Sequence, residues 1–61
     1  MVIINDNLIE NVMSAYINNG GSYFDIGDVE NFINDVMISE VSYDSVDEFI
    51  SLVVDEMLIS E

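Results

Sequence analysis

The stretch over residues 45–61, S-V-D-E-F-I-S-L-V-V-D-E-M-L-I-S-E, contains a helix start followed by a long apolar run. Ser45 is a favoured N-cap residue, and Glu48 lies three positions later, which is the spacing of a capping box. Acidic residues in the first turn also complement the positive end of the helix dipole. The stretch therefore predicts a helix over residues 45–59, and we expect the rest of the chain to pack around it.

At about 100° per residue, the apolar side chains of this helix form more than one stripe. The main stripe, expected to face a core, contains Val46, Phe49, Ile50, Val53 and Met57, with Val54 at its edge. A second stripe contains Leu52 and Ile59, and Leu58 points to a further side. A helix that is apolar on most sides is normally buried on more than one side. Either the helix is the centre of a bundle, or Leu52, Leu58 and Ile59 contact a second copy or a partner protein.

The chain has 61 residues, so we expect a single helical domain over 1–61. A chain of this size buries only about 60% of the surface that its unfolded form exposes. Hydrophobic residues nevertheless make up 51% of the sequence, and the mean hydropathy is +0.37. This apolar surplus argues against intrinsic disorder and predicts a homodimer or an apolar contact with a partner.

The net charge is −13, from 13 Asp and Glu residues and no Lys, Arg or His. A chain with this much negative charge is repelled by nucleic acid phosphates and by anionic lipid. We therefore expect it to bind neither nucleic acid nor a membrane surface. There is no Cys for a disulfide. The start, M-V-I-I-N-D, lacks the basic region of a signal peptide, and no apolar run approaches the roughly 18 residues of a membrane span. We therefore expect a cytoplasmic location, in the host cytoplasm if a phage encodes the protein.

A second amphipathic segment, over residues 6–18, precedes the main helix. Asn5, Asp6 and Asn7 are all N-cap types, and Asn7 with Glu10 has the spacing of a capping box. The expected core face contains Leu8, Val12, Ala15 and Tyr16, widened by Ile9 and Met13. The sequence N-G-G at 19–21 ends the segment, because glycine readily adopts the left-handed conformation found after a helix.

A third amphipathic segment, over residues 28–38, is capped by Asp25 or Asp28. Its expected core face contains Val29, Phe32, Ile33, Val36 and Met37. In the connector before it, we expect Tyr23 and Phe24 to fill the core, with an exposed anchor for a partner as the alternative.

These segments predict an all-α fold, a small three-helix bundle that forms a homodimer through residues 45–59. The alternative is an α+β fold in which short strands at 2–4 and 38–43 pair with each other.

The residue types that most often carry catalysis at neutral pH are missing. Without His, Cys, Lys or Arg there is no ordinary general base near pH 7 and no thiol nucleophile. Asp25, Asp28 and Glu30 lie close together but do not follow the spacing of a calcium-binding loop. We therefore expect neither an enzyme nor a cofactor nor a dedicated metal site.

The carboxylates are concentrated late in the chain, since only Asp6 and Glu10 precede Asp25. Carboxylates four residues apart on a helix lie about 6 Å apart along it, close to the spacing of successive phosphates on a strand. Two helices carrying such charges could imitate the anionic track of a duplex for a basic groove. The predicted anionic surface contains Asp28, Glu30, Asp35, Glu40, Asp44, Asp47, Glu48, Asp55 and Glu56.

In its size, its many carboxylates and its lack of basic residues, the chain resembles a class of small acidic proteins from phages and other mobile elements. These proteins inhibit the nucleic-acid-binding enzymes of the host, and they include DNA mimics, anti-restriction proteins and anti-CRISPR proteins. The resemblance implies a non-catalytic, anti-defence inhibitor whose partner is a basic nucleic-acid-binding enzyme or complex. The class shares no motif, so it transfers no functional residue to this chain.

Two other hypotheses remain open. The chain could be an antitoxin-like or regulatory module that docks the helix over 45–59 on a basic or hydrophobic partner surface. Alternatively, its acidity could serve only to keep an apolar protein soluble. Solubility alone explains the complete absence of Lys and Arg less well, because mixed charges give solubility with less self-repulsion.

Repulsion among uncompensated carboxylates predicts that added salt stabilises the fold. From about 0.01 M to about 1 M salt, the screening length falls from about 30 Å to about 3 Å. We expect the melting temperature, measured by circular dichroism, to rise over this range, by about 4–8 °C for each 1 kcal/mol of relieved repulsion. A melting temperature that stays flat would show that the carboxylates do not crowd one another.

Overall fold

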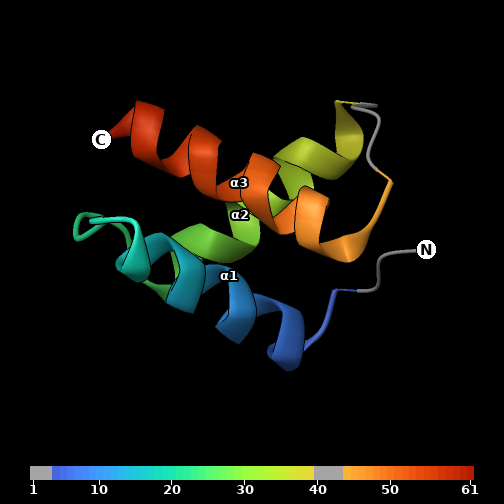
Figure 1. Cartoon of the computed structure of the whole chain (residues 1–61), viewed down its shortest axis with the longest axis horizontal. Coiled ribbons are helices and arrows are strands. Elements are labelled where there is room, and N and C mark those ends of the chain that lie inside the picture. The colour runs from blue at the N-terminus through green and yellow to red at the C-terminus, as the bar shows by residue number, and fades with distance from the viewer. Residues whose placement is uncertain (1–3, 40–43) are drawn as a thin grey trace.

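Three helices make up most of the chain that the computed structural model describes, which is residues 4–39 and 44–61. They are α1 (Asp6–Asn18), α2 (Ile26–Ile38) and α3 (Val46–Ser60). Each helix packs against both of the others. In Figure 1, α1 and α3 run in the same general direction, and α2 crosses behind α3. The described residues contain no strand, so the predicted all-α three-helix bundle is confirmed.

The two short strands of the alternative fold are absent from the described residues. Ile38 is the last residue of α2 and Ser39 is its C-cap, so a strand starting at 38 is wrong. Ile4 has no regular secondary structure. The other positions of these two strands, 2–3 and 40–43, lie outside the described residues.

Side-chain caps begin α1 and α3. Before α1, the Asn5 Oδ1 accepts a hydrogen bond from the Leu8 N–H at 2.9 Å. Asn7 lies inside the helix, so the predicted pairing of Asn7 with Glu10 is wrong. Asn5 is the cap because its extended backbone, at φ −149° and ψ 174°, has the conformation that an N-cap residue requires.

The capping box predicted for α3 is confirmed in one direction only. The Ser45 Oγ accepts a hydrogen bond from the Glu48 N–H at 3.2 Å. The Glu48 carboxylate reaches past Ser45 and accepts from the Asp44 N–H, also at 3.2 Å. It thereby stabilises the backbone one residue before the cap.

A complete capping box begins α2. The Asp25 Oδ1 accepts from the Asp28 N–H at 3.1 Å, and the Asp28 Oδ2 accepts from the Asp25 N–H at 3.3 Å. Asp25 is therefore the cap of the two candidates, and α2 starts at Ile26, two residues before the predicted start. Two carboxylates thus stabilise a helix terminus whose N–H groups carry partial positive charge.

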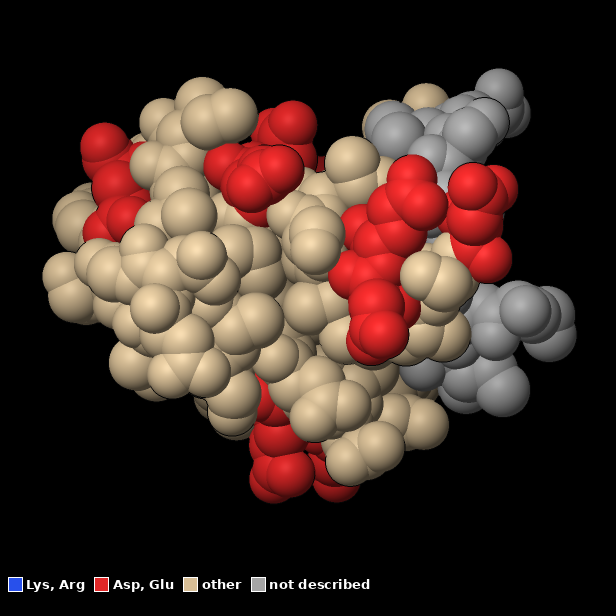
Figure 2. Space-filling view, viewed as in Figure 1, with Lys and Arg blue, Asp and Glu red and all other residues tan. Residues whose placement is uncertain are grey.

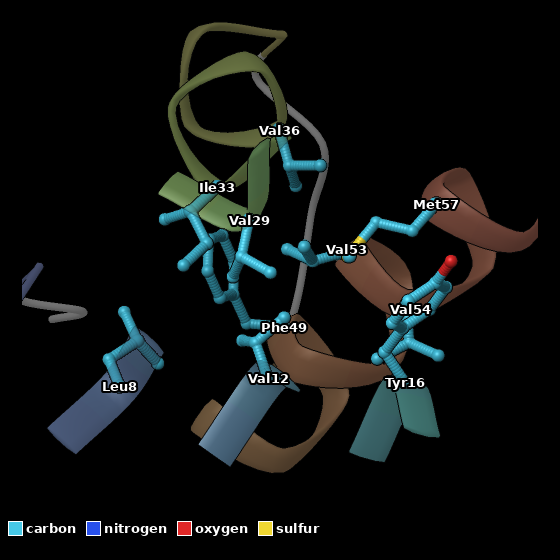
Figure 3. Packing of buried hydrophobic residues seen from close by; sticks show 10 residues of the cluster. All are labelled: Leu8, Val12, Tyr16, Val29, Ile33, Val36, Phe49, Val53, Val54 and Met57. Carbon is cyan, nitrogen blue, oxygen red and sulfur yellow. The ribbon is translucent and has the colours of Figure 1, made fainter. Parts of the chain in front are cut away.

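The core lies where the three helices meet, and Figure 3 shows its side chains pointing toward one another. It contains Leu8, Val12 and Tyr16 from α1, Val29, Ile33 and Val36 from α2, and Phe49, Val53, Val54 and Met57 from α3. Two α3 predictions are corrected. Val46, expected in the core, is 47% exposed at the start of the helix, whereas Val54, expected at the edge, is only 3% exposed. The buried face of α3 is therefore rotated toward Val54.

Tyr16 connects the core to the loop between α1 and α2. Its ring is fully buried, and its hydroxyl oxygen accepts hydrogen bonds from the N–H groups of Tyr23 at 2.9 Å and Phe24 at 3.1 Å. Gly21 lies directly against this ring, and a Cβ atom there would overlap it. The chain can turn so closely because Gly20 adopts the left-handed conformation, at φ +92°.

The side chains of Tyr23 and Phe24 behave differently from each other. Phe24 is half-buried and packs against Tyr16, with ring centroids 6.2 Å apart. Tyr23 is 74% exposed, so the expectation that its ring fills the core is wrong. The backbone of this loop, rather than the Tyr23 ring, is what Tyr16 holds in place.

We expect Tyr16→Phe to lower the free energy of unfolding by about 1–3 kcal/mol, because two backbone N–H groups lose their acceptor. Urea unfolding followed by circular dichroism measures the change. Tyr23→Phe is the matched control, since it removes a hydroxyl from an exposed ring. Equal stability of the two variants would show that the Tyr16 hydroxyl does not hold the loop.

Candidate protein-interaction surface

Nearly all the carboxylates reach the surface. Thirteen Asp and Glu residues occur in the sequence, and all but Glu40 lie in the described residues. Of these twelve, eleven are exposed and Asp28 is half-buried. Glu40, a predicted member of the anionic surface, lies outside the described residues.

The carboxylates of α3 form groups along its length. The pair Asp47 and Glu48 precedes the pair Asp55 and Glu56 by eight residues, which is about 12 Å along a helix axis. Figure 2 shows acidic patches following the course of α3, another patch over α1, and uncharged surface between them. The anionic surface on this face is therefore a series of patches rather than a continuous band.

Some of the predicted carboxylates have a structural role. Asp28 and Glu48 accept hydrogen bonds from the backbone at helix starts. Glu61, which was not predicted, accepts from the Ser22 N–H at 3.3 Å and so joins the end of α3 to the first loop. The remaining predicted carboxylates in the described residues are exposed: Glu30, Asp35, Asp44, Asp47, Asp55 and Glu56.

No side chain of the chain can neutralise these groups, because Lys, Arg and His are absent from the sequence. Apart from backbone N–H groups at the helix starts, the negative field is therefore weakened by solvent ions or by the positive groups of a partner. Such a field raises the association rate with a positively charged surface and slows association with a negatively charged one.

In the described part of the chain, the carboxylates do not gather into a metal-binding cluster. Among residues 4–39 and 44–61, no three acidic side chains lie close enough to hold a metal ion, and this includes Asp25, Asp28 and Glu30. Asp6, Glu10 and Glu30 line a hollow of about 260 Å³ between α1 and α2.

None of the helices in the described part of the chain is both long enough and apolar enough to cross a bilayer.

The three residues of the predicted apolar stripe have different surroundings. Leu52 and Leu58 are half-buried, whereas Ile59 is 78% exposed. Leu52 also lines a groove between α2 and α3, and Ile59 does not. The pairing of two copies through these residues stays a prediction.

The α2–α3 groove has a volume of about 450 Å³ and was not predicted from the sequence. It is lined by Phe32, Asp35, Val36 and Ser39 of α2 and by Leu52, Glu56 and Ser60 of α3. Several of these residues are four positions apart, so the sequence shows that they form one row on α2 and another on α3. The sequence does not show that the two rows face each other, because this depends on how the helices pack.

Comparison with protein-family models, with curated proteins and with solved structures finds no match to this chain. A functional assignment therefore depends on the charge and shape of the chain itself.

If α3 pairs two copies through its exposed apolar end, we expect Ile59→Asp to convert a dimer to a monomer, because the change places a further charge in the contact. Sedimentation equilibrium at low and high salt measures the mass. Ser51→Asp adds the same charge at another exposed position of α3 and should leave the dimer intact. A wild-type chain that is monomeric at all concentrations and salts would exclude the pairing.

Proposed function

We propose that this protein is a non-catalytic inhibitor that occupies the basic nucleic-acid-binding site of a host protein, in the manner of a DNA mimic. One observation supports the proposal most strongly: eleven of the twelve described carboxylates are exposed, on a chain that contains no Lys, Arg or His. Such a surface offers a basic protein what a nucleic acid offers, which is dense negative charge without competing positive charge.

Helix α3 is the element best suited to this contact. Asp44 and the paired carboxylates Asp47 and Glu48 lie at its start, Asp55 and Glu56 follow, and Glu61 lies at its end. The gap of about 12 Å between the two pairs is wider than the spacing of successive phosphates. Lys and Arg side chains are long and flexible enough to reach separated charges, so a basic groove does not require an unbroken track.

The surface also differs from what solubility requires. Interspersed charges of both signs keep a small domain soluble, with less self-repulsion than a single sign. In this chain the carboxylates repel one another, and there is no basic side chain to reduce that repulsion. A basic binding partner gives that charge a function, because association neutralises it.

The exposed apolar residues of α3 favour a second candidate. Val46 is 47% exposed at one end of α3, and Ile59 is 78% exposed at the other. An antitoxin-like or regulatory module could dock the Ile59 end of this helix into a groove of its partner. In that case, replacing the exposed apolar residues by charged ones would weaken binding more than neutralising the carboxylates would.

The test begins with the immobilised protein, which captures its partner from a bacterial lysate at low salt and releases it to competing duplex DNA. The purified partner is then assayed for DNA binding in the presence of the inhibitor. The test variant neutralises the two carboxylate pairs of α3, as D47N, E48Q, D55N and E56Q. We expect inhibition to be lost and the affinity to depend less steeply on salt concentration, because four charged contacts are removed.

A control variant with the same charge change outside α3 carries D6N, E10Q, E30Q and D35N. Each of the two variants keeps one of the two carboxylates that line the α2–α3 groove. The control should inhibit nearly as well as the wild type. Equal loss in both variants would exclude a specific role for α3, and full activity of both, with loss in Ile59→Asp, would favour the second candidate.

A further inference from the structure

The α2–α3 groove combines an apolar floor with a charged rim. Val36 is buried, and Phe32 and Leu52 are half-buried, so the floor consists of hydrocarbon side chains. Asp35 on α2 and Glu56 on α3 are exposed and line the same groove. Its volume of about 450 Å³ is within the roughly 300–1,000 Å³ of pockets that bind small ligands.

The floor is held in position by its neighbours. The Phe32 ring packs edge-to-face against Phe24, with centroids 4.9 Å apart and planes at 67°. Phe24 in turn packs against Tyr16 in the core. At the C-terminal end of α2, the Ser39 hydroxyl donates to the Val36 carbonyl at 2.8 Å, which closes the last turn of the helix. A groove supported in this way requires little rearrangement on binding.

The rim determines which occupant fits. A second copy of this chain brings further carboxylates and not a single basic side chain, so it would add negative charge beside Asp35 and Glu56. A purely apolar side chain would contact the floor and leave both carboxylates unpaired. A side chain with a long hydrocarbon stem and a cationic end contacts both parts.

Arginine satisfies these requirements better than lysine. Its planar guanidinium can stack on an aromatic ring and, at the same time, donate two parallel hydrogen bonds to a carboxylate. The groove supplies the ring of Phe32 together with the carboxylates of Asp35 and Glu56. The lysine ammonium is a compact, strongly hydrated charge that lacks this planar geometry.

We propose that the α2–α3 groove binds an arginine side chain of the partner protein. The proposal rests on the proposed function, because it assumes a basic partner, and it adds that one arginine contact lies in this groove. The α3 carboxylates would then supply long-range attraction, and the groove would supply a short-range contact that distinguishes arginine from lysine.

The experiment uses the intact protein and two synthetic nine-residue probes, one of alternating glycine and arginine and the other of alternating glycine and lysine. Both probes carry the same charge. We expect the arginine probe to bind about two- to fivefold more tightly, because the guanidinium can stack on the Phe32 ring and bond to a carboxylate at the same time, which the lysine ammonium does less well. Nuclear magnetic resonance titration gives the affinities, and the largest shifts should occur at Phe32 and Leu52.

Two pairs of substitutions with the same charge change separate the groove from general acidity. The variant with D35N and E56Q changes both rim carboxylates and should lose the preference for arginine. The control with D55N and E10Q changes one exposed Asp and one exposed Glu that do not line the groove, and it should keep the preference. Phe32→Leu keeps the floor of the groove apolar but removes the aromatic ring, so this variant should also lose the preference for arginine.

Equal affinity for the two probes, with shifts spread over all acidic positions, would overturn the arginine groove and leave the proposed inhibition standing. Shifts of Phe32 and Leu52 that depend on protein concentration without probe would show that a second copy occupies the groove, which also overturns it. An arginine preference that D35N and E56Q abolish supports the groove. If such a protein inhibits none of the nucleic-acid-binding proteins that it captures, the proposed function fails independently.

Discussion

Hydrophobic packing among three short helices has to exceed the repulsion of carboxylates that no basic side chain of the molecule can neutralise. The described core contains ten buried side chains, four of them from α3. Fully burying a side chain such as Phe49 or Met57 contributes about 1.5–3 kcal/mol. Every described carboxylate stays at or near the surface, where water and salt weaken the repulsion. The separation of an apolar interior from an anionic exterior follows directly from this constraint.

Backbone N–H groups provide the positive partners that side chains lack. Asp25, Asp28 and Glu48 accept hydrogen bonds at the starts of α2 and α3, where the helix dipole is positive. The ends of the helices carry no basic residue, so the dipole is complemented at one terminus only. Part of the acidity therefore stabilises the fold, while Asp47, Asp55 and Glu56 remain available to a partner.

The two proposed roles of α3 overlap at Glu56. The exposed carboxylates of α3 give the molecule a long-range attraction for a positively charged surface. Glu56 also lines, together with Leu52, the groove between α2 and α3 that is proposed to bind arginine. Charge alone gives fast association with many basic proteins, whereas a shaped contact distinguishes among them. The proposed inhibitor would combine the two.

The sequence by itself determined the three helices, the glycine-rich turn after α1 and the anionic surface, because hydrophobic period, capping residues and charge are local properties. The sequence also identified most of the core residues, because the spacing of the apolar residues shows which of them share a helix face. Tertiary structure decided how each face is rotated, which buries Val54 and exposes Val46. It also decided that the Tyr23 backbone, not its ring, bonds to the core, and that Phe32 and Leu52 line one groove. These features depend on contacts between different helices and loops, whose relative placement a one-dimensional pattern does not specify.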